Sequence, residues 1–102
     1  MKIYEGTRSI DGLVVTVDGR RLDQHWEVKC FTKSGFDWTY EGAHPQQLAL
    51  AILYDHLGDG GRAIRLSKEF MQRVVANLDN NWTLTSDQVE AAIRSFEAGP
   101  AG

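Results

Sequence analysis

The pattern of apolar and polar residues changes near residue 41. Before that point, apolar side chains alternate with polar ones over short stretches, as in FDWTY at residues 36–40. After it, apolar residues recur at the spacing of one helix face. A period of two residues is typical of strands and a period of 3.6 of helices. The pattern therefore predicts an α+β fold in which strands come first and helices follow.

The expected sheet is an N-terminal antiparallel β-meander of about four strands. Asp11-Gly12 and Asp18-Gly19 can supply the positive φ angles of hairpin turns, and they flank an apolar stretch at residues 13–17. Two further alternating stretches follow, HWEVKCF at residues 25–31 and FDWTY at residues 36–40. We expect the aromatic face of this sheet to pack against the helices.

Three C-terminal helices are predicted. Pro45 suits a first helical turn, and residues 48–54 are apolar on every side, as in a helix that is surrounded by protein. Gly58 should end this central helix in the left-handed conformation. Asp59 should cap a second helix over residues 61–78, and a capping box of Thr85 and Gln88 should start the third.

Length and composition fit a single α+β domain over residues 1–98, followed by a flexible tail at residues 99–102. The three tryptophans among 102 residues can build a core without a disulfide or a metal. Cys30 is the only cysteine, so neither an internal disulfide nor a cysteine metal cage can form. We therefore expect no cofactor.

Charge and hydropathy narrow the classes of partner. The net charge is −3 with both signs spread along the chain, which disfavours extensive phosphate binding and DNA mimicry. The start of the chain lacks the order of a secretion signal, and the apolar run LALAILY is too short to cross a membrane. A cytoplasmic location is expected.

Asp55, His56 and Asp59 are the first candidate site. A carboxylate beside an imidazole can act as a general base or bind a metal. Adjacent helical positions point about 100° apart, however, so Asp55 and His56 should not share a ligand. We expect His56 to interact with the carbonyl end of its helix. Asp55 lies in the last turn, where a negative charge opposes the helix dipole, so it needs a partner such as an indole N–H, a backbone turn or an arginine. The role of Asp55 is then either structural support or recognition of a partner.

Arginines on the outer side of the second helix are the second candidate. They are Arg62, Arg65 and Arg73, and Glu69 lies among them. Glu69 is four residues from both Arg65 and Arg73, a spacing at which side chains on a helix can form ion pairs. A solvated, self-paired face is the expected structure. Binding of nucleic-acid phosphates, with help from Arg20, Arg21 and Lys68, is the alternative and would be weak and sensitive to salt.

Two other features have a structural and a functional interpretation. Phe36, Trp38 and Tyr40 could stack single-stranded bases, but we expect them to pack in the core. The glycine-rich LGDGGR follows a helix and matches no phosphate-binding motif, so it is expected to join two helices.

The segments GFDWTY, HPQQLALAILYDHLGD and NWTLTSDQVEAAI resemble a family of small bacterial and archaeal proteins, the domain of unknown function numbered 6166. The segment HWEVKCFT and His44 depart from the family's common pattern. The matching positions are Gly35, Phe36, Trp38, Pro45, Gln47, Leu48, Ala49, Leu50, Gly58, Asp59, Trp82, Leu84 and Thr85. The resemblance implies no known activity. It implies genes that lie among phage, plasmid and other mobile elements, and proteins that dock on a larger host complex, such as an anti-CRISPR inhibitor of a defence complex.

These observations predict a small, non-enzymatic, cytoplasmic protein-binding module, as a monomer or a homodimer. The expected binding surface joins the sheet edge to the loop that carries Glu41 and His44, with Asp55 as a further recognition point. Arg62, Arg65 and Arg73 form the second choice. The alternative function is a nucleic-acid-binding accessory protein that uses the same arginines and an exposed Trp38. A small hydrolase or metal enzyme around Asp55, His56 and Asp59 is the least favoured hypothesis.

Overall fold

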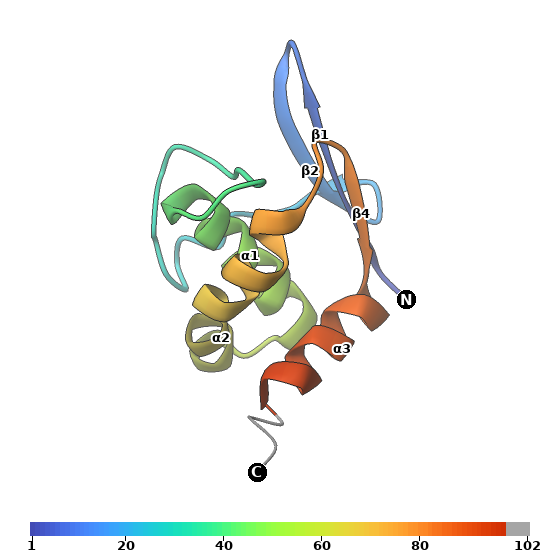
Figure 1. Ribbon diagram of the computed structural model, residues 1–102. Coiled ribbons are helices and arrows are strands. Elements are labelled where there is room, and N and C mark those ends of the chain that lie inside the picture. Colours follow the sequence, from blue (N-terminus) through green and yellow to red (C-terminus); the bar gives the residue numbers. More distant parts are fainter. Residues whose placement is uncertain (98–102) are drawn as a thin grey trace.

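A buried helix, α1, forms the centre of the computed structural model, which describes residues 1–97 (Figure 1). It spans Ala43–Leu57, and residues 48–53 are wholly inaccessible to solvent. Pro45 lies in its first turn, and Gly58 ends it at φ +68°, as the sequence predicts. Residue 98 and the expected tail, residues 99–102, lie outside the described residues.

The sheet has four antiparallel strands in the order β3-β2-β1-β4, which confirms the predicted α+β class. The strands are β1 (Ile3–Ser9), β2 (Gly12–Val17), β3 (Arg20–Arg21) and β4 (Trp82–Thr85). The turn between β2 and β3 has φ +50° at Asp18 and +83° at Gly19, the two positive values that a tight hairpin turn requires. Figure 1 shows the β1–β2 hairpin projecting beyond the helices.

Two of the four strands are not the ones that the alternation predicts. Residues 22–42, which include HWEVKCF and FDWTY, contain no strand. Positive φ angles at His25 (+55°), Gly35 (+105°) and Thr39 (+80°) interrupt any extended conformation in this long loop. The two strands found in their place are β3, which has only two residues, and β4, which follows α2 in the chain and pairs Thr85 with Ile3.

Two further helices follow α1, as predicted. They are α2 (Gly60–Arg73) and α3 (Ser86–Glu97), with a short 3₁₀ turn, η1 (Val75–Asn77), after α2. The second helix was predicted over residues 61–78 but ends at Arg73. Two consecutive valines, which have a lower helix propensity than the residues before them, follow at positions 74 and 75. The capping box is confirmed, because Gln88 N–H donates to Thr85 Oγ1 at 3.1 Å and Thr85 N–H donates to Gln88 Oε1 at 2.9 Å. Within residues 1–97, no helix has the length and apolar character needed to cross a membrane.

Gln47 of α1 holds the long loop in place. Its side chain is wholly buried. Its Oε1 accepts hydrogen bonds from the N–H groups of Phe31 (2.7 Å) and Thr32 (3.3 Å). Its Nε2 donates to the carbonyl oxygens of Gln24 (2.6 Å) and Lys29 (3.0 Å). One amide thus satisfies four backbone groups of a segment that has no regular structure of its own.

Arg8 of β1 holds the other half of the loop. Its Nη2 lies 2.7 Å from Asp37 Oδ1 and donates to the Trp38 carbonyl at 3.3 Å. Partial burial alone would raise the pKa of the Asp37 carboxyl, but hydrogen bonds from the Trp38 backbone, Arg8 and Tyr40 lower it. Trp38 is completely buried, and its ring packs edge-on against that of Trp82 with centroids 5.8 Å apart, which confirms the core-packing prediction for Trp38. The same prediction is wrong for Tyr40, which is exposed.

Candidate functional site

Asp55 joins the end of α1 to β1. Its Oδ2 accepts a hydrogen bond from the Tyr4 hydroxyl at 2.8 Å and lies 3.1 Å from Lys2 Nζ. Burial, and then the bond to Asp55, raises the pKa of the Tyr4 hydroxyl well above its ordinary value. Asp55 therefore has the compensating partners that its position requires. They are a tyrosine and a lysine, and not the indole, backbone turn or arginine that the sequence suggested.

His56 and Asp59 point away from Asp55 toward other elements. His56 Nε2 lies 2.7 Å from Glu90 Oε1 on α3, so it contacts a neighbouring helix and not the carbonyl end of its own. The hydrogen bond with His56 lowers the pKa of Glu90. Asp59 Oδ1 accepts from the backbone N–H of Arg62 at 3.1 Å and caps α2, as predicted. The three side chains thus form three separate contacts and no common site.

The predicted arginine face is divided between contacts with α3 and solvent. Arg62 Nε donates to Glu97 Oε2 at 2.8 Å. The guanidinium of Arg73 lies 3.0 Å from Glu69 and 5.7 Å from the ring centroid of Phe96. Arg65 is exposed and, within residues 1–97, makes no hydrogen bond or ion pair with another side chain. Two of the three arginines therefore hold α3 against α2.

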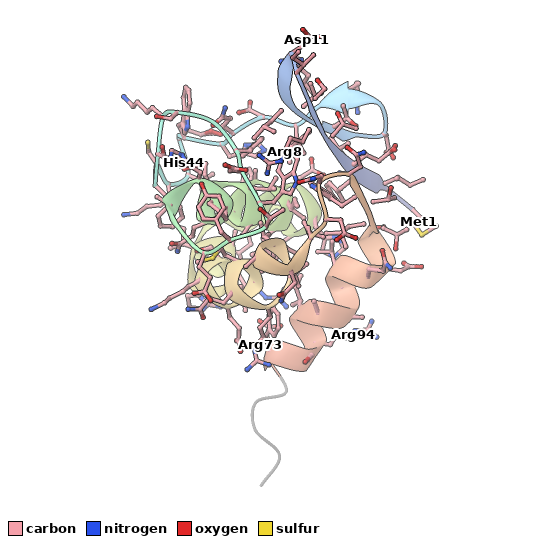
Figure 2. All side chains as sticks on the ribbon, turned by 45° about the horizontal axis from the view of Figure 1, so that its top comes forward. Met1, Arg8, Asp11, His44, Arg73 and Arg94 are labelled. Atoms are coloured by element: carbon pink, nitrogen blue, oxygen red, sulfur yellow. The ribbon has the colours of Figure 1, made fainter. Side chains whose placement is uncertain are left out.

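Glu41 contacts α2, whereas His44 lies apart from Arg73. Glu41 Oε1 accepts a hydrogen bond from Gln72 Nε2 of α2 at 3.3 Å, and His44 is half-buried in the first turn of α1. Figure 2 shows His44 and Arg73 on different sides of the molecule. The structure does not bring the six predicted partner-binding residues into one surface.

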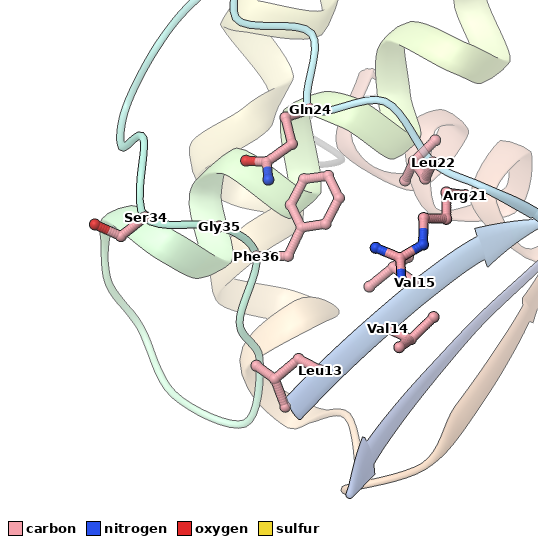
Figure 3. Close-up of a pocket in the computed structure, with 9 residues that line it drawn as sticks. All are labelled: Leu13, Val14, Val15, Arg21, Leu22, Gln24, Ser34, Gly35 and Phe36. Carbon is pink, nitrogen blue, oxygen red and sulfur yellow. The ribbon is translucent and has the colours of Figure 1, made fainter. Parts of the chain in front are cut away.

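A pocket of about 280 Å³ lies beside β2, at a place that the sequence did not indicate (Figure 3). Side chains of β2 form one wall, and the loop at Ser34, Gly35 and Phe36 forms the other. Arg21 and Gln24 complete the lining. The signal was hidden, because Phe36 begins a stretch whose alternation predicts a strand, whereas residues 34–36 belong to the long loop.

The outer edge of β2 opens onto this pocket. β3 pairs only with Thr16 and Val17, so residues 13–15 have no strand beside them on that side within residues 1–97. Backbone groups of successive residues in an antiparallel strand point to opposite sides. Val15 accepts from Leu22 N–H on the outer side at 3.0 Å, so Leu13 points its N–H and C=O to the outer side as well. The site therefore combines an unpaired strand edge with a concave, partly apolar wall.

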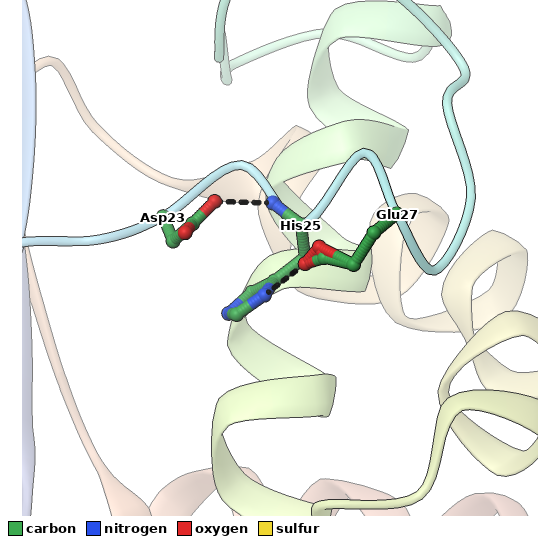
Figure 4. A group of neighbouring side chains, drawn as sticks. All are labelled: Asp23, His25 and Glu27. Atoms are coloured by element: carbon green, nitrogen blue, oxygen red, sulfur yellow. Dashed lines mark hydrogen bonds and ion pairs between the residues drawn. The ribbon is translucent and has the colours of Figure 1, made fainter.

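Asp23, His25 and Glu27 form the one cluster of metal-ligating side chains among residues 1–97 (Figure 4). Their ligand atoms lie within 4.8 Å of one another. Asp23 Oδ1 accepts from the His25 N–H at 2.8 Å, and His25 Nδ1 lies 3.0 Å from Glu27 Oε1. The D-x-H-x-E spacing of residues 23–27 is the sequence signal for this cluster. These bonds stabilise the turn in which His25 has a positive φ, and we assign no ion to the cluster.

Comparison with known proteins places the chain in a family. The profile of DUF6166, a family of unknown function, matches residues 4–95, which include the pocket, the long loop and most of all three helices. No curated protein and no solved structure matches the chain. Because the match covers most of its length, the chain belongs to DUF6166, a family of unknown function.

Proposed function

We propose that this protein is a non-enzymatic, protein-binding module that pairs an extended segment of its partner with the outer edge of β2. The observation that carries the proposal is the outer edge of β2 at Leu13, which has no strand beside it within residues 1–97 and lies next to a pocket. Unpaired N–H and C=O groups at a sheet edge are a template for a further strand, and neighbouring pockets select its side chains.

The size and lining of the pocket favour a partner side chain over a cofactor. Its volume of about 280 Å³ lies just below the roughly 300–1,000 Å³ of typical small-molecule sites. Aliphatic side chains of β2 and the ring of Phe36 are among its apolar lining. The catalytic hypothesis around Asp55 and His56 receives no support, since those side chains contact different elements.

A pair of proline variants tests the proposal. Leu13→Pro removes an N–H that points to the open edge of β2. Thr83→Pro is the matched control, because Thr83 occupies the equivalent outward position on β4, the other edge of the sheet. Tagged wild type and both variants would be used to capture partners from the lysate of the native host, after nuclease treatment and with washes at low and high salt.

Capture of the same protein by wild type and Thr83→Pro, and its loss with Leu13→Pro, is the expected result. Equal capture by both proline variants would reject the edge of β2 as the binding surface. Recovery of nucleic acid that is lost at high salt would instead favour the nucleic-acid alternative. In that alternative only the arginines could contact nucleic acid, because Trp38 is buried and cannot stack on a base.

The arginine face is tested with a single variant. Arg65→Glu changes the arginine that has no side-chain partner among residues 1–97, and should leave α3 in place. Arg73→Glu would also disturb the contacts with Glu69 and Phe96, so its effect on binding could follow from a change in packing. Unchanged capture by Arg65→Glu is expected, and loss of capture would move the binding surface to α2.

The biological setting belongs to the same proposal. The resemblance that the sequence shows is the support for a mobile-element origin and for a host complex, such as a defence complex, as the partner. A cytoplasmic location is part of the same proposal. Identification of the captured protein tests this part directly. A partner unrelated to host complexes would remove the defence interpretation and leave the binding-module proposal intact.

A further inference from the structure

Arg21 supplies the one charged side chain among the residues that line the pocket beside β2. Figure 3 shows its guanidinium directed toward Phe36, across the pocket. Within residues 1–97, Arg21 forms no ion pair, in contrast to Arg8, Arg62, Arg73 and Arg94. A guanidinium presents planar donors that match a carboxylate, so the pocket favours an acidic group.

The register of β2 and β3 indicates where the acidic residue would lie. Arg21 pairs with Thr16, so both side chains are on the same face of the sheet. Val14 is two residues before Thr16 and shares that face. A partner residue opposite Val14 would lie on the same face, about 7 Å along the strand from Arg21. An arginine side chain can reach a carboxylate at that position.

We propose that the pocket receives the carboxylate of an aspartate or glutamate in an extended segment of a protein partner, and that Arg21 binds this carboxylate. The inference rests on the proposed function and adds the chemistry of the partner. Loss of such a charge-assisted contact should weaken binding by about tenfold to a hundredfold.

A phage-displayed library of random nine-residue peptides tests the inference and does not require the natural partner. The library is selected against wild type, Arg21→Glu, Arg20→Glu and Leu13→Pro. Arg20→Glu is the matched control, because it makes the same change of charge one residue away. Arg20 pairs with Val17, so its side chain lies on the opposite face of the sheet.

Wild type and Arg20→Glu should enrich peptides that carry Asp or Glu at one fixed position between strand-forming residues. Arg21→Glu should lose this preference and select Lys or Arg there. Its affinity for the peptides that wild type selects should fall by about tenfold to a hundredfold. An acidic preference that persists in Arg21→Glu, or disappears equally in Arg20→Glu, would overturn the inference.

The outcomes separate this inference from the proposed function. Peptides that require Leu13 but show no acidic preference would reject the Arg21 contact and keep the strand pairing. Peptides that bind Leu13→Pro as well as wild type, or the failure of wild type to enrich any peptide, would reject both. Should Leu13→Pro fail to fold by circular dichroism, N-methylation of alternate amides in a selected peptide blocks strand pairing with the wild-type protein unchanged. Full binding of that peptide would likewise reject both.

Discussion

Gln47 Oε1 accepts a hydrogen bond from the backbone N–H of Phe31 at 2.7 Å, and the Gln47 side chain is wholly buried. This contact links the central helix to a loop that forms one wall of the candidate pocket through Ser34, Gly35 and Phe36. A buried amide on α1 thus supports a binding wall that has no strand or helix of its own.

Replacement of Gln47 by leucine should lower the free energy of unfolding by about 2–4 kcal/mol. Four backbone groups of the loop would lose their partner, and each buried group left unsatisfied costs about 1–3 kcal/mol unless the loop moves to reach water. Urea denaturation followed by tryptophan fluorescence measures the loss. Hydrogen exchange should also accelerate at the N–H groups of Phe31 and Thr32.

Gln46→Leu is the control for this prediction. Gln46 precedes Gln47 in α1 and donates one hydrogen bond, to Ser67 Oγ at 3.2 Å. Its loss should cost about 1 kcal/mol. Equal losses in the two variants would mean that the four bonds of Gln47 contribute no more than a single polar contact.

Gly6 on β1 lies directly beneath the indole of Trp82. An alanine Cβ at this position would lie 2.6 Å from Trp82 Cζ2 and even closer to the indole nitrogen. Gly6→Ala should therefore destabilise the protein by about 1–3 kcal/mol, as overpacking does in other cores. Thermal denaturation of Gly6→Ala, Trp82→Leu and the double variant should show that the two losses are not additive, because the leucine leaves space for the methyl group.

Gly61→Ala provides the comparison for Gly6→Ala. The nearest atom to a Cβ at Gly61 is Asp59 Oδ1 at 3.7 Å, an ordinary contact, and the residue lies in the first turn of α2. This variant should be unchanged or more stable by up to about 1 kcal/mol. A loss as large as that of Gly6→Ala would contradict a specific clash with Trp82.

Tyr4 should make the protein sensitive to alkaline pH. Its hydroxyl has a pKa above the ordinary value of 10.0, because burial and then the bond to Asp55 disfavour the phenolate. The folded state therefore retains the proton more tightly than the unfolded state. The protonated Tyr4 hydroxyl therefore contributes fully to the free energy of unfolding below pH 10. This contribution falls by up to about 1.4 kcal/mol per pH unit as the pH rises from 10 toward the folded-state pKa.

Tyr4→Phe should cost about 1.5 kcal/mol at neutral pH, through the lost bond to a carboxylate. Its unfolding free energy should then fall less steeply above pH 10 than that of wild type. Tyr40→Phe serves as the control, since the Tyr40 ring is 42% exposed and should affect the alkaline slope much less. Identical slopes in wild type and Tyr4→Phe would show that Tyr4 does not control alkaline unfolding.

The helices could be predicted because their signals are local. The buried run of α1, its end at Gly58 and the capping box of Thr85 and Gln88 depend on residues a few positions apart. The sheet depends on a distant pairing instead, since Ile3 pairs with Thr85 at the opposite end of the chain. Alternation in a single sequence does not show which strands meet, and a loop that buries Trp38 produces the same pattern as a strand.

The candidate pocket could not be predicted for the same reason. Arg21 and Phe36 become neighbours because β3 ends after two residues and the loop folds back over β2. The arginines of α2 could be identified from the sequence, but not their contacts with α3. Helical spacing gives the face of a side chain and not the element that packs against it, so the partners Glu97 and Phe96 required the structure.

The contact between Arg62 and Glu97 should make the docking of α3 sensitive to acid. The hydrogen bond from Arg62 lowers the pKa of the Glu97 carboxyl below its ordinary value of 4.5. A carboxyl with a lowered folded-state pKa stabilises the fold above its unfolded pKa. That stabilisation is lost as the pH falls through the folded-state value. Wild type should therefore exceed Glu97→Gln in stability at neutral pH, and the difference should shrink below pH 4.5 and then disappear.

Urea denaturation of wild type and Glu97→Gln across pH 3–7 measures this difference directly. High salt should reduce it at neutral pH, because the pair is partly exposed to solvent. Glu27→Gln is the control, since Glu27 pairs with His25 in the long loop and not with α3. Hydrogen exchange in α3 should accelerate in Glu97→Gln and not in Glu27→Gln. Equal exchange rates in the two variants would assign the docking of α3 to its apolar contacts, such as the edge-on packing of Phe96 against Phe70.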